Sequence, residues 1–307
     1  MTGRILLVGL VVAAASVPLL AGDYFRYIAM LWMVYAISAI GLQIPLGLAS
    51  VYSFGQGAFM LIGAYATGLG VIHGVPVILA LLAGVVLAAM IGVVLALPSL
   101  RLSAFALAIV TLGAASVLFH GVKAFQITGG PQGLFLPHVP FVELAGGRAF
   151  YLCVLVLLVA ASVVAHCVDH GPIGRSLRAA AANPLMAQSF GIHLMKTRTL
   201  AFVLSAVYGA VAGGLLGLLT GYIAPEAFAP ELSIQIFAAV MIGGSGRYWG
   251  AMLGALFIVL IPELTQAVQN LGAIVYAVLF ILVATLYPGG LHQLVTTAFG
   301  RRPVGGS

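Results

Sequence analysis

One long run of this sequence, residues 27–100, contains no aspartate, glutamate, lysine or arginine. A soluble domain has about 25 % charged residues, whereas this chain has 6 % charged and 63 % apolar residues and a mean hydropathy of +1.22. Backbone polar groups in lipid must be satisfied within the protein, which leaves helices or closed barrels. Because the apolar residues do not alternate, we expect an all-α polytopic membrane protein with about eight to ten transmembrane helices.

Charged and turn-forming residues divide the chain into successive predicted spans. The segment at 232–244 is short for a span and is either a tilted or extended crossing or a re-entrant segment. If it does not cross, the end of the chain lies on the other side of the membrane. We expect the remaining spans near residues 5–22, 27–44, 57–73, 76–97, 102–122, 150–168, after Arg198, at 248–262, and from Glu263 to about residue 287.

The basic residues fall unevenly on the two sides of these spans. Ten spans with a cytoplasmic N-terminus place nine basic residues inside and three outside, which fits the positive-inside rule. Both termini are then cytoplasmic. The inside set is Arg4, Arg101, Arg175, Arg178, Lys196, Arg198, Arg247, Arg301 and Arg302, and the outside set is Arg26, Lys123 and Arg148.

The longest polar stretch with signs of structure lies between two spans, at residues 167–199. Pro172 suits the first turn of a short helix, because the N–H that proline lacks has no helical partner there. Asn183 and Pro184 suit the N-cap and first position of a second helix. Gly191 suits its end, where the backbone turns left-handed. The sequence therefore predicts a basic pair of short helices on the cytoplasmic side.

Residues 45–59 (PLGLASVYSFGQGAF) are too apolar for an ordinary loop and too rich in glycine and serine for an ordinary helix. They are consistent with a discontinuous segment that borders a substrate path. They are equally consistent with two helices packed closely through glycines. Farther along, Gly209, Gly213, Gly217 and Gly221 recur every four residues on one helix face, which predicts close helix packing.

Several kinds of chemistry are excluded or unsupported. Neither lysine, Lys123 or Lys196, follows a glycine, so the chain has no phosphate-binding loop of the G-x-x-x-x-G-K-[ST] type. We find no nucleophile–base spacing, no metal-ligand or cofactor spacing among cysteines and histidines, and no basic patch for nucleic acid. No charge lies clearly in mid-membrane, which counts against an ion-driven pump. A transport pore powered by a separate chain remains.

Four stretches resemble permeases of the branched-chain amino acid type of ABC transporter, and more closely the LivM-like branch than its LivH-like partner. IGRSLRAAAANPLMAQSFGIHLMKTRTLAFVLSA, at 173–206, resembles the family's cytoplasmic coupling loop. LASVYSFGQGAFMLIGAYATG and ITGGPQGL resemble an N-terminal segment and an external loop. GYIAPEAFAPELSIQIFAAVMIGGSGRYWGAMLGA resembles a fourth family segment. Together they sample most of the chain from residue 40 to 265, in the family's order.

The resemblance implies a single permease domain over residues 1–307, with a coupling loop at about 169–198. It implies two cytoplasmic ABC ATPase subunits, a second homologous permease of the LivH-like type, a periplasmic solute-binding protein, and the bacterial inner membrane, with no cofactor and no nucleic acid. The expected coupling residues are Gly174, Arg175, Arg178, Asn183, Pro184 and Gly191. The expected residues near the translocation path are Ser53, Gly55, Gln56 and Gly57.

The chain departs from the family pattern in the middle of the coupling loop. Relatives often carry acidic residues there, whereas this sequence reads AAANP at 180–184. An acid that could pair with an ATPase is missing, so apolar docking contacts or a different partner are expected. Residues 53–57, SFGQG, also alter the family's S-L-G-x-A pattern, and Gln56 places a polar group near membrane depth.

Together these features predict the membrane-spanning permease subunit of an ATP-driven, binding-protein-dependent importer, and no enzyme. Branched-chain amino acids are the expected substrates. Urea, short amides or another small polar solute are the alternative, because permeases of this type handle them as well. A self-sufficient carrier or channel is the competing class, and uptake by the chain alone would distinguish it.

Overall fold

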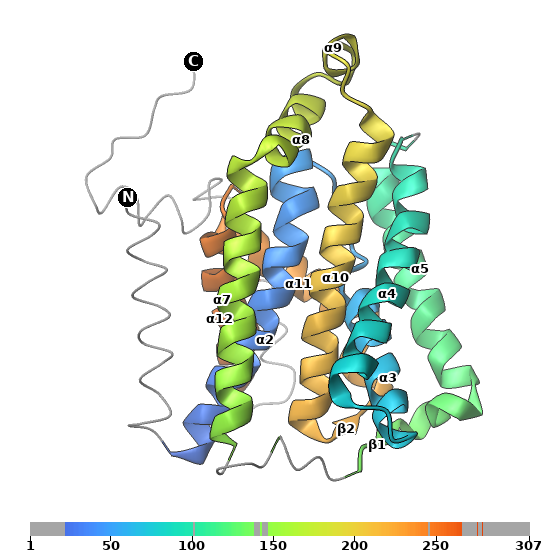
Figure 1. Cartoon of the computed structure of the whole chain (residues 1–307), viewed down its shortest axis with the longest axis vertical. Coiled ribbons are helices and arrows are strands. Elements are labelled where there is room, and N and C mark those ends of the chain that lie inside the picture. The colour runs from blue at the N-terminus through green and yellow to red at the C-terminus, as the bar shows by residue number, and fades with distance from the viewer. Residues whose placement is uncertain are drawn as a thin grey trace.

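The computed structural model of the chain describes residues 22–100, 102–137, 142, 147–244, 246–265, 275 and 278. These residues form an elongated bundle of helices, with a pair of short helices at one end and a small β-ribbon at the other (Figure 1). The predicted spans at 5–22 and from 263 to about 287 lie almost wholly outside the described residues, as do both termini.

The first half of the bundle follows the predicted spans closely. The described helices here are α2 (Asp23–Gln43), the π-helical turn η1 (Ile44–Leu48), α3 (Gln56–Ile72), α4 (Val77–Ala96), the 3-10 turn η2 (Leu97–Leu100) and α5 (Ala104–Ala124). Residues 50–55 between η1 and α3 are not helical, and Ser50 has a positive φ of 51°. A break in the helix at this position was one of the two interpretations of residues 45–59.

The second half begins with two 3-10 turns and ends with α12. Its elements are the 3-10 turns η3 (Gln126–Thr128) and η4 (Gly130–Gln132), β1 (Leu134–Phe135), α7 (Arg148–His170), α8 (Pro172–Ala182), α9 (Pro184–Ser189), α10 (Leu194–Thr220), β2 (Tyr222–Ile223), the 3-10 turn η5 (Pro225–Phe228), α11 (Pro230–Gly243) and α12 (Tyr248–Thr265). β1 and β2 pair antiparallel, with Leu134 opposite Ile223 and Phe135 opposite Tyr222.

Six of the described segments are long and apolar enough to cross a membrane. Two further helices, α3 and α12, are also apolar but are shorter. An all-α polytopic membrane protein is thereby confirmed. The six segments are Asp23–Leu48, Val77–Ser99, Ala104–Ala124, Arg148–His170, Leu194–Thr220 and Pro225–Gly243.

The segment that was expected to be short for a span forms α11, and with η5 it is long and apolar enough to cross a membrane. η5 follows strand β2 directly, and the first turn of α11 lies farther into the bundle, where Ser233 accepts a hydrogen bond from Gly57 at the start of α3. α11 ends at Gly243, and four residues separate it from the start of α12. At the start of α12, the Tyr248 hydroxyl lies 3.4 Å from Nδ1 of His166. His166 is near the C-terminal end of α7, which leads into α8. The crossing interpretation of 232–244 therefore agrees with the fold.

The described charges separate between the two ends of the bundle. Arg175, Arg178, Lys196, Arg198 and Arg247 lie at the end that holds α8 and α9 (Figure 1). At the ribbon end lie Arg26, Lys123 and Arg148, together with the acids Asp23, Glu226 and Glu231. This is the distribution that the sequence predicts.

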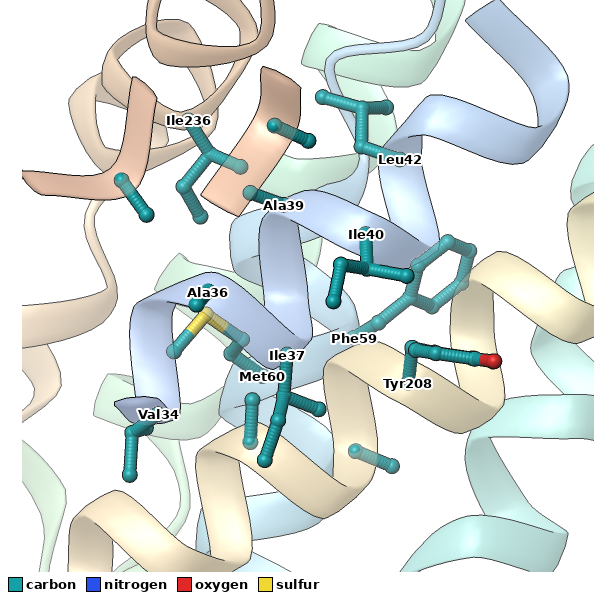
Figure 2. Close-up of a cluster of buried hydrophobic side chains, with 14 of the residues drawn as sticks. Val34, Ala36, Ile37, Ala39, Ile40, Leu42, Phe59, Met60, Tyr208 and Ile236 are labelled. Atoms are coloured by element: carbon teal, nitrogen blue, oxygen red, sulfur yellow. The ribbon is translucent and has the colours of Figure 1, made fainter. Parts of the chain in front are cut away.

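The core lies where α2, α3 and α10 meet. Phe59 of α3 and Tyr208 of α10 lie beside Ile40 of α2 (Figure 2), and Phe59 and Ile40 are almost completely buried. By contrast, α4 and α5 expose rows of aliphatic side chains such as Ile78 and Val117. Lipid is the natural environment of such faces in a membrane protein.

Candidate functional site: the coupling loop and the helix break

The pair of short helices predicted at residues 172–191 is present, and it projects beyond the bundle (Figure 1). Pro172 is in the first turn of α8, which confirms its predicted place. Asn183 caps α9, because its Oδ1 accepts hydrogen bonds of 3.1 Å from the N–H groups of Leu185 and Met186. Pro184 follows at the first helical position.

The end of α9 is closed as tightly as its start. Gly191 has φ +80°, and its N–H donates to the Gln188 carbonyl at 2.9 Å. The N–H of Ile192 donates to the Ala187 carbonyl at 3.0 Å, which completes a Schellman motif. A helix of six residues would be marginal alone, so these caps at both ends keep the loop structured.

Two arginines fix α8 on the C-terminal end of α7. Arg178 donates from Nη1 to Oδ1 of Asp169 at 2.6 Å and from Nη2 to the Asp169 carbonyl. Arg175 donates from Nη1 to the His170 carbonyl at 3.3 Å. Both cations thus meet the carbonyl end of α7, where the helix dipole favours positive charge.

Close contact holds the rest of α8 in place. A side chain on Gly174 would collide with the carbonyl oxygens of Val168 and Asp169, so only glycine fits there. Leu177 and Ala180 of α8 are themselves buried. The six residues expected to carry the coupling-loop pattern therefore shape this element, by caps, ionic contacts and close packing.

The loop exposes three large apolar side chains. Apolar docking contacts were expected here, but these residues were not named as the ones that provide them. Leu185, Met186 and Phe190 are 78 %, 60 % and 82 % exposed. Large apolar side chains this exposed, gathered on one projecting element, mark a contact surface. The available signal was the position of Leu185 and Met186 directly after the Asn183–Pro184 cap, in an otherwise polar stretch.

The second candidate region is the helix break at residues 50–55. The N–H groups near the start of α3 are satisfied by side-chain hydroxyls: Phe54 donates to Thr111 of α5 at 2.9 Å, and Gly57 donates to Ser233 of α11 at 2.9 Å. The N–H of Gly55 donates to Ser53 at 3.3 Å. A helix can begin inside the bundle here because other helices supply acceptors.

Gln56 does not lie on the surface of the described chain. Its side chain is completely buried, and Nε2 lies 2.9 Å from the Ser38 carbonyl, 3.2 Å from the Ser38 hydroxyl and 3.3 Å from the Ser205 carbonyl. The Ser205 hydroxyl donates to Oε1 of Gln56 at 2.7 Å. Ser53, Gly55 and Gly57 are buried as well. A role of these four residues in a path stays a prediction.

The break carries two aromatic side chains that are not buried, Tyr52 and Phe54. Phe54 and Tyr52 lie 4.7 and 6.0 Å from the ring of Phe237 on α11, measured between ring centroids. Tyr52 and Phe54 also border an apolar cavity of about 380 Å³ against the first two turns of α5. The break therefore presents two aromatic rings to a cavity, while Ser53 is buried and Ser50 is exposed.

The predicted glycine stripe joins α10 to α3. A side chain on Gly213 would collide with the Met60 carbonyl, and one on Gly209 would come within 2.6 Å of Phe59 Cβ. Close packing is confirmed for these two. Gly217 has more room, with its nearest neighbour at 3.1 Å. Gly221 differs in role, because it has φ +66° and ends α10.

No group of three or more histidine, cysteine, aspartate or glutamate side chains within the described residues could hold a metal ion. The arrangement combines a capped projecting loop, the helix α10 that continues from it, and a helix break whose following helix, α3, is bonded to α10 through Gln56 and Ser205.

Comparison with known proteins gives a consistent result. Residues 24–284 match the family model of the branched-chain amino acid transport system permease component. The chain is 29 % identical, over 94 % of its length and 74 % of the relative's, to the high-affinity branched-chain amino acid transport system permease protein LivM of Escherichia coli (strain K12). It is 30 % identical, over 81 % of its length and 84 % of the relative's, to a probable branched-chain amino acid transport permease protein LivH of Methanocaldococcus jannaschii. No solved structure is a significant match.

Proposed function

The chain belongs to the family of branched-chain amino acid transport permease components, and from this premise we propose that it is the LivM-like subunit of an ATP-driven importer for branched-chain amino acids. In this proposal a second, LivH-like permease completes the membrane domain. Two separate ABC ATPases hydrolyse ATP, and a periplasmic binding protein delivers the substrate. The names of the relatives support the substrate class, and urea and short amides are the alternatives.

The observation that carries the proposal is the capped loop formed by α8 and α9. It lies at the end of the bundle where basic residues gather, which favours a cytoplasmic location in a bacterial inner membrane. Its exposed Leu185, Met186 and Phe190 offer an apolar surface to a partner. This fits the absence of acidic residues from 180–184, because the docking contacts do not need them.

The decisive experiment is reconstitution in proteoliposomes. We expect uptake of leucine only when this chain, its partner permease, both ATPases, the binding protein and ATP are all present. Uptake by this chain alone would identify a self-sufficient carrier or channel. Competition by valine and isoleucine, set against urea and acetamide, separates the two substrate classes.

The docking role can be tested by reversing one charge. Arg178→Glu places two acids side by side at the junction of α7 and α8, where Arg178 now bonds Asp169. We expect the cognate ATPase to co-purify about tenfold less, because a broken charge pair and the displaced loop together weaken docking by more than 1 kcal/mol. Unchanged co-purification contradicts the docking role.

A matched control is Arg148→Glu, at the other end of α7. It makes the same charge change at the far end of α7, the helix whose C-terminal end Arg178 of α8 contacts. We expect it to leave ATPase co-purification at the wild-type level. The swapped pair Asp169→Arg with Arg178→Asp restores opposite charges within the chain. Recovery of docking in this variant indicates that Arg178 acts by holding α8 on α7.

A further inference from the structure

We propose that Gln56 is a positioning residue that transmits movement of the coupling loop to the helix break. Together with Ser38 and Ser205 it forms what we call the Gln56 clamp, which makes the start of α3 move as one body with α10. The inference rests on the proposed function, because it requires an ATPase that moves the loop.

One helix, α10, connects the loop to the clamp. α10 begins at Leu194, three residues after Gly191, and runs without interruption to Thr220. Ser205 stands eleven positions after Leu194, so it lies about 16 Å along the helix at about 1.5 Å per residue. A displacement of the loop therefore reaches Ser205 along one continuous helix, deep inside the bundle.

Hydrogen bonds to the Gln56 side chain hold α3 and α10 in one position relative to each other. Both ends of the Gln56 amide are bonded: Oε1 accepts from Ser205, and Nε2 faces oxygen atoms of Ser38 and Ser205. Away from water, sliding α10 along α3 would leave this amide unpaired, which is strongly unfavourable. Glycines enforce the fit, because a Cβ at Gly41 or Gly209 would lie 3.2 or 3.1 Å from Nε2.

The helix break is held less strongly by α5 and α11 than the start of α3 is held by the clamp. Thr111 of α5 and Ser233 of α11 each bond one N–H of this region. Each of these contacts is one hydrogen bond to one helix, whereas the clamp joins α2, α3 and α10 through both ends of one amide. Movement of α10 is therefore expected to carry the start of α3 with it and to shift the break relative to α5 and α11.

What the movement would change is the aromatic border of the cavity. Tyr52 and Phe54 precede Gln56 by four and two residues and line the 380 Å³ space beside α5. Their rings meet Phe237 of α11, which stands outside the clamp. A shift of α3 would separate or close these rings. The clamp thus links the loop formed by α8 and α9 to the apolar cavity beside α5 through a contiguous network.

The test uses the complete transporter in proteoliposomes and measures uptake and ATP hydrolysis together. Gln56→Met keeps the side-chain size and removes the hydrogen bonds. We expect ATP hydrolysis to continue while substrate taken up per ATP falls by about tenfold, within the usual range of coupling between two sites. A purely structural role would lower uptake and hydrolysis in proportion, because less transporter would assemble.

Controls separate the clamp from a general loss of buried polar groups. Ser162→Ala removes an equally buried hydroxyl of α7, which bonds the Leu158 carbonyl of its own helix and the Met252 sulfur of α12. Both partners lie outside the clamp, so this variant should keep the wild-type ratio. Gln56→Met alone leaves the buried Ser205 hydroxyl without its acceptor, and the variant could fail to assemble for that reason. In the double variant Gln56→Met with Ser205→Ala this hydroxyl is absent, and we expect the same loss of coupling. A wild-type ratio in an assembled variant overturns the proposal.

A distance measurement tests the rigid unit directly. Spin labels at positions 52 and 200, in a chain with both cysteines replaced by serine, report the helix break against α10. Trapping the ATPases with a nucleotide analogue should leave this distance unchanged, while the distance between labels at 117 and 200 changes. In Gln56→Met the 52–200 distance should shift or broaden. A shift of 52–200 in the unsubstituted clamp overturns the proposal.

The two proposals fail differently. If the complete wild-type transporter shows no ATP-driven uptake, the proposed function is wrong, and the coupling role of Gln56 is wrong with it. If the wild type transports and Gln56→Met keeps its uptake per ATP, only the clamp is wrong.

Discussion

The contact between α3 and α10 and the loop formed by α8 and α9 are stabilised in opposite ways. At the first, backbone meets backbone, and Gly213 leaves no space for even one added carbon. At the second, six residues of helix project from the bundle and keep their shape through an Asn183 cap and a Gly191 turn. Close packing gives a contact that tolerates no change of volume, whereas capping gives a shape whose outer surface is free to adapt to a partner.

The largest expected effect comes from filling the α3–α10 contact. Gly213→Leu would drive a side chain into the Met60 carbonyl, which neither helix can move away from. We expect the free energy of unfolding to fall by about 3 kcal/mol or more, or no folded protein at all. Size-exclusion profiles and thermal unfolding in detergent would measure it.

Gly113→Leu on α5 is the matched control. No atom lies within 4 Å of a Cβ built there, so the free energy of unfolding should change by less than about 0.5 kcal/mol. Equal losses in the two variants would show that bulk alone, and no specific contact, decides the outcome.

The coupling loop should respond differently. Asn183→Ala removes the acceptor for two N–H groups of α9. A lost N-cap costs about 1 kcal/mol, which corresponds to about fivefold weaker association with the ATPase. Thermal unfolding of the bundle should be unchanged, because α9 stands apart from the core.

Asn183→Asp is the informative companion, because it keeps the acceptor and adds a favourable charge at the helix start. ATPase association should stay near the wild-type level. If Asn183→Asp is as weak as Asn183→Ala, the amide acts through a contact with the partner, and its cap is not the cause.

The smallest effect is expected at the ribbon end. Lys123 Nζ lies 2.9 Å from Oε1 of Glu226, but the two side chains are 30 % and 59 % exposed. Such pairs contribute about 0.5 kcal/mol, and a double-mutant cycle with Lys123→Ala and Glu226→Ala would measure the coupling. A value above about 2 kcal/mol would show that ionic contacts hold this end, and that the comparison between packing and capping is incomplete.

Local signals in the sequence predicted the pair of short helices, α8 and α9, well. Pro172, Asn183, Pro184 and Gly191 act within a few residues of themselves, so their caps follow from spacing alone. The spans and the split of charges between the two ends likewise follow from composition along the chain.

Contacts between distant segments could not be predicted in the same way. Gln56 meets Ser205 across 149 positions, and nothing in a single sequence says that their helices cross at that depth. The same holds for Thr111 and Ser233 as acceptors at the helix break. Gly221 extends the spacing of the glycine stripe, yet the helix ends there, and spacing does not distinguish a contact from a cap.

The bond from Gly57 to Ser233 spans 176 positions and bears on how the protein matures. A chain is made from its N-terminus, so α3 enters the membrane long before α11 exists. Until then the Gly57 N–H lacks its hydroxyl acceptor and needs water or another temporary partner. The start of α3 therefore reaches its final form late in biogenesis, and nascent chains stopped before Ser233 should keep this segment accessible to water-soluble reagents.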